Sequence, residues 1–171
     1  MGENLTEIIG IVVVVLVVAG LIGYFVMRSL KGTLRLTLNS LRVSSGENFT
    51  GTVQMTCRKP VEGHRLVVTL IGKEKYRRQT DDGMKTETRE FYRNHTVLEE
   101  ARSYEAGFEE TYSFEHEAPT GGQVGSSGSG LAGVLDLFSG RDRDLSWKLE
   151  GRLEAKGIDL SDSKRVDVNF R

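Results

Sequence analysis

Few residues in this chain have types and spacings that support chemistry. The three histidines, His64, His95 and His116, stand far apart, and no His-x-x-x-His or Cys-x-x-Cys pair typical of a metal site occurs. Cys57 is the single cysteine and has no neighbouring histidine to lower its pKa, which favours a small, half-buried strand residue over a nucleophile. We therefore predict no catalytic residue, no metal ligand, no cofactor and no enzymatic activity.

Two further patterns resemble sites but have simpler interpretations. Glu109-Glu110 and Glu115-His116-Glu117 are acidic enough for a cation. On an alternating strand, however, Glu115 and Glu117 lie on one face, and Phe114 and His116 lie on the other. We therefore interpret the two glutamates as part of an ordinary solvent-exposed strand face. The run 121–130 is rich in glycine and serine but lacks the Gly-Lys-Ser/Thr ending of a phosphate-binding loop, so it is predicted to be a flexible linker.

One basic cluster remains. Its cations are Lys73, Lys75, Arg77 and Arg78. They could contact anionic lipid headgroups or a phosphorylated partner, but we favour a solvated strand end or loop because runs of charge are usually exposed. After residue 27 the chain has 23 basic and 22 acidic residues, which is not the basic excess of a nucleic-acid-binding protein. No nucleic-acid partner is predicted.

The first element that the chain requires is a membrane span. Seventeen of the 20 residues from Ile8 to Met27 are apolar and none is charged, whereas the rest of the chain is about one-third apolar. Twenty helical residues span about 30 Å, the thickness of a bilayer's hydrocarbon core, so a transmembrane helix is predicted over 8–27. The residues that characterise it are Ile8, Gly10, Leu16, Ala19, Gly23, Tyr24 and Met27.

Two features of this segment add detail. Tyr24 is placed for the membrane interface, and the spacing of Ala19 and Gly23 would let two helices approach closely, so a homo-oligomer is an open option. A cleaved signal peptide is the alternative. It is disfavoured because no basic residue precedes the segment, the apolar run is long, and no small-x-small cleavage site follows.

The flanks of the segment set its orientation. Arg28, Lys31 and Arg35 follow it, and no Lys or Arg precedes it. The positive-inside rule then places the N-terminus outside and the C-terminal domain in the cytoplasm of a single-pass protein. The predicted organisation is a tail over 1–7, the helix over 8–27, a juxtamembrane linker over 28–32, and a domain over 33–171.

Beyond residue 32 the apolar period is two. Leu34, Leu36 and Leu38 alternate with polar residues, and the same alternation recurs in later runs separated by turn signals. Strands are expected over, among others, 64–72, 86–93 and 96–100, with a flexible loop over 119–144 in which 131–138 could be a short helix. Seven or eight short strands with almost no helix predict an all-β, antiparallel, immunoglobulin-like β-sandwich.

Several of these runs resemble arrestin-like domains in the order of their motifs. The run 45–53 is similar to that family's Gly-Glu-x-Φ-x-Gly-x-Val turn and strand, where Φ is apolar. A Phe-x-Phe…Pro segment and a closing pair of strands are also similar. The matching residues are Gly46, Glu47, Phe49, Gly51, Val53, Phe114, Pro119 and Trp147. The resemblance implies a cytoplasmic, non-enzymatic domain that works through protein–protein contacts.

Two departures limit what the resemblance implies. Arrestins have two such sandwiches and are normally soluble, whereas this chain has room for one and carries the apolar segment. No phosphate-sensing residue is therefore transferred to it. The expected function is a membrane-anchored, arrestin-like adaptor or scaffold that faces the cytoplasm and binds a protein partner. The alternatives are an extracytoplasmic β-sandwich that binds a carbohydrate or an envelope component, and a structural subunit of a membrane complex.

Overall fold

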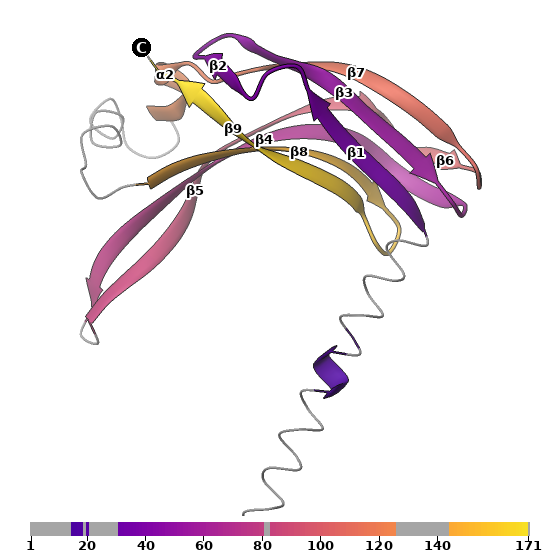
Figure 1. The fold of residues 1–171 in the computed structure, drawn as a ribbon, viewed down its shortest axis with the longest axis horizontal. Coiled ribbons are helices and arrows are strands. Elements are labelled where there is room, and N and C mark those ends of the chain that lie inside the picture. Colours follow the sequence, from indigo (N-terminus) through magenta and orange to yellow (C-terminus); the bar gives the residue numbers. More distant parts are fainter. Residues whose placement is uncertain (1–14, 19, 21–30, 81–82, 126–143, 171) are drawn as a thin grey trace, which may run out of the picture.

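The computed structural model describes residues 15–18, 20, 31–80, 83–125 and 144–170. Strands dominate the part from residue 31 onward (Figure 1). The elements in chain order are β1 (Gly32–Leu38), β2 (Arg42–Ser44), β3 (Asn48–Cys57), β4 (Val61–Thr80), β5 (Gly83–Glu99), β6 (Arg102–Tyr104), β7 (Glu109–Glu117), α2 (Gly121–Gly125), β8 (Asp144–Ala155) and β9 (Leu160–Asn169). The prediction of an all-β domain is confirmed.

The strands form two sheets that lie one above the other. One sheet has three strands in the order β1-β3-β7, and the other has six, in the order β2-β9-β8-β4-β5 with β6 paired to β4. Every pairing is antiparallel except that of β2 with β9, which is parallel. The six-stranded sheet arches, and its outer face is concave (Figure 1).

The core lies between the two sheets and follows the predicted alternation. In β1 the burial pattern alternates residue by residue, so Leu34 and Leu36 face inward while Thr33 and Arg35 are exposed. Phe49, Val53 and Met55 of β3 are fully buried in the same way. Each such side chain stabilises the fold by about 1.5–3 kcal/mol, because its apolar surface leaves water.

The β4–β5 hairpin is longer than predicted. The strand expected over 64–72 continues to Thr80, and the two strands expected over 86–93 and 96–100 are one strand, β5. Register pairs run from Leu66↔Glu99 to Thr80↔Gly83, with an irregularity between Gly72 and Lys73. Residues 73–80 and 83–90 form a projection, the arm, which extends beyond the sandwich (Figure 1). The arm is two-stranded past Lys75, where the pairing of β8 with β4 ends.

The loop predicted over 119–144 begins with ordered structure. Pro119 is buried, and α2 follows it at once, with Val124 in the core. The backbone N–H of Thr120 donates to Oε1 of Gln123 at 2.8 Å, which caps this turn. The expectation of a flexible linker is therefore wrong for 121–125, because Val124 gains an apolar contact there. Residues 126–143, including the suggested helix over 131–138, lie outside the described residues.

Most of the predicted membrane span lies outside the described residues. Residues 15–18 and 20 are helical, and the side chains of Val15, Leu16, Val17 and Val18 are 47–66% exposed. Within the described part of the chain no helix has the length and apolar character needed to cross a bilayer. The undescribed residues among those singled out are Ile8, Gly10, Ala19, Gly23, Tyr24, Met27 and Arg28.

The motif residues in the run 45–53 build the sandwich. Gly46 has a φ of +80° in the turn between β2 and β3, a conformation that costs other residues free energy, and its N–H donates to the carbonyl of Ala118. A carboxylate oxygen of Glu47 accepts the N–H of Ser44 at 2.7 Å. Gly51 packs so closely on β1 that a Cβ there would lie 2.1 Å from the carbonyl oxygen of Thr37. Both glycines are required by backbone geometry.

Substitution of these glycines should separate the two effects. Gly51→Ala is expected to lower the free energy of unfolding by about 1–3 kcal/mol, because the pairing of β1 with β3 must shift. Gly46→Ala should cost about 1–2 kcal/mol through its left-handed φ. Urea unfolding measures both. The control is Gly122→Ala, which meets no neighbouring atom and should change stability by less than about 0.5 kcal/mol. Equal stability of all three variants would contradict the close approach at Gly51.

Candidate anion-binding surface

The residues considered for catalysis or metal binding do not assemble into a site. Among the described residues no group of three or more His, Cys, Asp or Glu side chains could hold a metal ion. Cys57 is fully buried in β3, and burial raises the pKa of its thiol above the ordinary value. A thiol of this kind is a core residue rather than a nucleophile.

His116 is a buried histidine between the sheets. It lies on β7, its Nδ1 is 2.8 Å from the Thr96 hydroxyl oxygen on β5, and its Nε2 has no hydrogen-bond partner among the described residues. Burial, with a smaller contribution from His95, lowers the pKa of His116 from 6.5 to about 4. The imidazole is therefore neutral near pH 7.

The acidic runs on β7 alternate as predicted. Glu115 and Glu117 lie on the exposed face, while Phe114 and His116 point into the core. Oε1 of Glu115 accepts a hydrogen bond from the side chain of Asn48 on the neighbouring strand. These carboxylates are thus the solvated face of a strand.

Glu99 is a carboxylate that sequence reasoning did not single out. It accepts hydrogen bonds from the hydroxyls of Tyr112 and Tyr104, at 3.0 Å for the latter, and from Nη1 of Arg102 at 2.7 Å. Burial raises the pKa of Glu99, but these three bonds outweigh it, so the pKa lies below the ordinary value. Burial and this carboxylate together raise the pKa of both tyrosines. The cluster ties β5 to β6 and β7 and offers no group near neutral pKa for acid–base chemistry.

The predicted basic cluster lies in the arm. Lys73, Lys75 and Arg77 alternate along β4, so all three occupy the outer face of the six-stranded sheet and are exposed. Arg78 lies in the same strand, in register with Lys85 of β5. The favoured interpretation, a solvated strand, agrees with this exposure. The neighbouring strands bring further cations beside these residues, which the local sequence could not indicate.

At the base of the arm these lysines border a depression with a volume of about 370 Å³. Lys73 is in register with Ser146, and Lys148 with Arg165, so β8 and β9 bring two further cations beside β4. The depression is lined by Lys73, Lys75, Asp144, Ser146, Trp147, Lys148, Ser163 and Arg165. Clustered cations and hydroxyls are the donors that bind phosphate or carboxylate groups.

Ion pairing leaves the positive charge concentrated near this depression. Nine cations lie on the outer face of the six-stranded sheet by register: Arg42, Arg65, Lys73, Lys75, Arg77, Arg93, Lys148, Arg152 and Arg165. Five of them pair with carboxylates of that face at 2.5–3.1 Å, namely Arg42, Arg65, Arg93, Lys148 and Arg152. Within the described residues, Lys73, Lys75, Arg77 and Arg165 have no such pair. Among the described acids of that face, Asp144 is the one left without such a pair.

Glu150 organises the paired part of this face. It is 6% exposed, and its carboxylate accepts hydrogen bonds from Nζ of Lys148 and Nη2 of Arg152, both at 2.5 Å. Burial raises the pKa of Glu150, but these bonds outweigh it and the net shift is downward. Lys148 is thereby held at the edge of the depression with its charge partly compensated.

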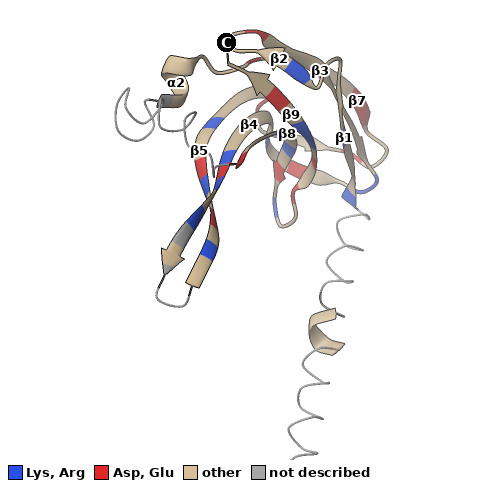
Figure 2. Ribbon diagram, turned by 60° about the vertical axis from the view of Figure 1, so that its left-hand side comes forward, with Lys and Arg blue, Asp and Glu red and all other residues tan. Residues whose placement is uncertain are grey.

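The opposite face of the molecule carries mainly negative charge. The outer face of the three-stranded sheet carries Arg35 against Glu109, Glu115 and Glu117, with threonines between them. Figure 2 shows basic segments along the arm and an acidic segment on β7. The chain's net charge of −1 therefore conceals two faces of unlike charge.

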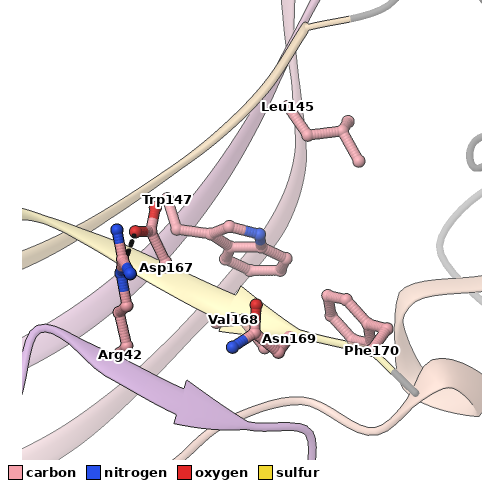
Figure 3. A pocket seen from close by; sticks show the side chains of 7 residues that line it. All are labelled: Arg42, Leu145, Trp147, Asp167, Val168, Asn169 and Phe170. Carbon is pink, nitrogen blue, oxygen red and sulfur yellow. Dashed lines mark hydrogen bonds and ion pairs between the residues drawn. The ribbon is translucent and has the colours of Figure 1, made fainter.

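A second hollow, of about 340 Å³, opens at the end of the core (Figure 3). Arg42 pairs with Asp167 at 3.1 Å on one side of it, and Leu145, Trp147 and Phe170 lie on the other. Trp147 also meets Phe91 edge to face, with ring centroids 5.2 Å apart. Trp147, one of the motif residues, thus serves in an aromatic cluster at the base of the arm.

Lys31 fixes the chain at the start of β1. Its Nζ donates to the carbonyl oxygens of Lys156 at 2.6 Å and Ile158 at 3.3 Å, both in the connection between β8 and β9. Its own carbonyl accepts the N–H of Arg58. Lys31 and Arg35 are two of the basic residues predicted to set the orientation in the membrane. Lys31 is therefore attached to the sandwich, and Arg35 is exposed on β1.

Comparison with known proteins identifies the fold. No family model and no curated protein matches the chain. The crystal structure of Spo0M, a sporulation control protein from Bacillus subtilis, is similar at a TM-score of 0.57 and 16% identity, over 82% of this chain and 50% of Spo0M. This likeness supports an arrestin-like β-sandwich. The chain spans about half the length of Spo0M. The DNA glycosylase AlkC from Pseudomonas fluorescens aligns at a TM-score of 0.40 and 14% identity, over 81% of this chain and 30% of AlkC.

The buried histidine makes stability depend on pH. Because the pKa of His116 is about 4 when folded and 6.5 when unfolded, the unfolded chain takes up a proton below pH 6.5 that the folded chain does not. This one group should lower stability by about 3 kcal/mol in total as the pH drops through this window, and its contribution levels off below pH 4. Urea unfolding of His116→Gln should show a shallower decline. His64→Gln, at an exposed position, should keep the wild-type slope, and identical slopes in all three proteins would contradict this assignment.

Proposed function

We propose that the chain is a single-pass membrane protein whose arrestin-like sandwich acts in the cytoplasm as a non-enzymatic adaptor or scaffold. The observation that carries the proposal is the uncharged segment from Ile8 to Met27, which is followed within five residues by the first strand of the sandwich. An anchor so close to the domain confines it to the membrane surface, where its effective concentration for membrane partners is high. The basic residues Arg28, Lys31 and Arg35 favour the cytoplasmic side.

The interaction role is supported by the fold and by one exposed strand. Spo0M is described as a sporulation control protein, which fits a regulatory sandwich rather than an enzyme. In this chain β5 is the outermost strand of the six-stranded sheet, and among the described strands it pairs with β4 alone. Its Val97 is 39% exposed. Free strand edges accept a partner's strand through backbone hydrogen bonds, so we assign β5 as the docking edge for the protein partner.

Two alternatives share the same fold. An extracytoplasmic sandwich that binds a carbohydrate or an envelope component needs the reverse orientation in the membrane. A structural subunit of a membrane complex needs the same orientation but a permanent partner. Orientation is therefore the property to measure first.

Thiol labelling in intact cells measures orientation directly. Thr111 is exposed on the outer face of β7, whereas Cys57 is buried and the native wild-type protein should not react. Thr111→Cys is expected to react with an impermeant maleimide only after the membrane is permeabilised, and Asn4→Cys to react in intact cells. Reaction of Thr111→Cys in intact cells would instead favour the extracytoplasmic alternative.

Site-specific crosslinking measures the docking edge. A photoreactive amino acid in place of Asn94 should give a discrete protein adduct in the membrane fraction, because this side chain is exposed on the free strand and, in register with the core residue Leu70, lies off the concave outer face. The matched control replaces Thr111, on the other sheet, and should give none. Adducts of equal yield from both positions, or from neither, would argue against β5 as the docking edge.

A further inference from the structure

We propose that the concave outer face of the six-stranded sheet lies against anionic lipid headgroups, with Lys73, Lys75 and Arg165 contacting their phosphates. This inference rests on the proposed membrane anchor and adds to it a defined orientation of the domain on the bilayer. The surface is built by three strands that are distant in sequence. Only the lysines belong to the basic run of the sequence; Arg165 is brought beside them by the pairing of β9 with β8.

The sign of the charge differs between the two outer faces. Among the described residues, register places nine cations and five acids on the outer face of the six-stranded sheet, and one cation and three acids on the outer face of the three-stranded sheet. An anionic bilayer attracts the first face and repels the second. The attraction amounts to about fivefold in association per cation near the surface. Charge alone therefore selects which face meets the lipid.

The depression has the chemistry that a phosphate group requires. Lys73, Lys75 and Arg165 have no ion-pair partner among the described residues, so binding a phosphate breaks no existing pair. The hydroxyls of Ser146 and Ser163 line the same depression and can donate to phosphate oxygens. A volume of about 370 Å³ accommodates a phosphate with part of a headgroup. Lys148 is already paired with Glu150 and contributes less.

The place where the chain enters the domain also favours this orientation. Lys31, just before β1, is bonded to the β8–β9 connection, so the chain enters the domain at one end of the arch (Figure 1). The arm forms the other end, and the concave face lies between the two (Figure 1). If the membrane anchors the domain at the first end, the arm at the second end can bring its basic residues to the same membrane surface. The acidic three-stranded sheet then faces away, and the free edge of β5 stays open to a protein partner.

Fluorescence quenching in vesicles tests this orientation with the full chain. Thr88 is exposed, in register with Lys75 on the same face, and Thr88→Cys can carry a fluorophore while Cys57 stays buried. The protein is reconstituted into phosphatidylcholine vesicles with or without about one-third phosphatidylserine, with a quencher on the headgroups. We expect stronger quenching in the anionic vesicles, and loss of the difference at high salt, since screening shortens electrostatic reach.

Variants identify the residues. Arg165→Gln should lower the equilibrium constant for docking on the anionic surface, obtained from the lipid-dependent quenching, about fivefold and Lys73→Gln/Lys75→Gln about 25-fold, whereas Arg35→Gln, on the opposite sheet, should leave it unchanged. Equal quenching in neutral and anionic vesicles, or equal effects of Arg165→Gln and Arg35→Gln, would overturn the proposal. So would a fluorescence change that requires an added acidic peptide and no anionic lipid, because the face would then be a protein site.

A separate experiment shows whether the proposed membrane span, rather than the lipid-binding face, is wrong. If alkaline carbonate releases the chain from the vesicles, the proposed membrane span is wrong. The face is then tested by flotation of the released protein with anionic vesicles. Flotation of the wild type and the Arg35→Gln variant, but not of Lys73→Gln/Lys75→Gln, would support the lipid-binding face without the anchor. Absence of flotation for the wild type would overturn it.

Discussion

The apolar layer between the two sheets is the interaction on which the rest of the molecule depends. Strands from both sheets contribute alternate side chains to it, from Leu36 and Phe49 on the three-stranded sheet to Leu70 and Leu149 on the six-stranded one. The layer fixes the register of each strand, since a shift of one residue would exchange its buried and exposed faces. It therefore also fixes which charged side chains reach the outer surfaces. The basic depression and the acidic opposite face are consequences of how the core is packed.

Sequence reasoning predicted the features that depend on local alternation. The inward positions of Leu34, Leu36, Phe49 and Val53 could be read directly, because period-two burial is a property of each strand alone. The arrestin-like resemblance pointed to the same run, and the structure gives its glycines a physical reason at Gly46 and Gly51. These motif residues served to identify the fold, and in the structure they determine the geometry of its turn and its strand pairing.

Features that depend on pairing between distant strands could not be predicted. The run from Lys73 to Arg78 has little apolar content, so nothing local indicated that hydrogen bonding to β5 would extend β4 through it. Arg165 lies some 90 residues from the lysines that it joins, and only the order β9-β8-β4 brings them together. The parallel pairing of β2 with β9 and the burial of Val124 beside the core are of the same kind. The candidate surface therefore emerged from topology, whereas Lys73 and Lys75 could already be recognised in the basic run of the sequence.

The arm has a consequence for how such a chain can vary. Past Lys75, where β8 no longer pairs with β4, it is a two-stranded ribbon outside the apolar layer, so the length of that part is not constrained by core packing. Insertion of one residue in each strand just past Lys75 would turn Arg77 to the opposite face and present Tyr76 in its place. Insertion of two residues in each would keep Arg77 on the basic face and lengthen the arm by about 7 Å. Related chains that keep a cation at this place on the arm should therefore have arms whose strands differ in length by even numbers of residues.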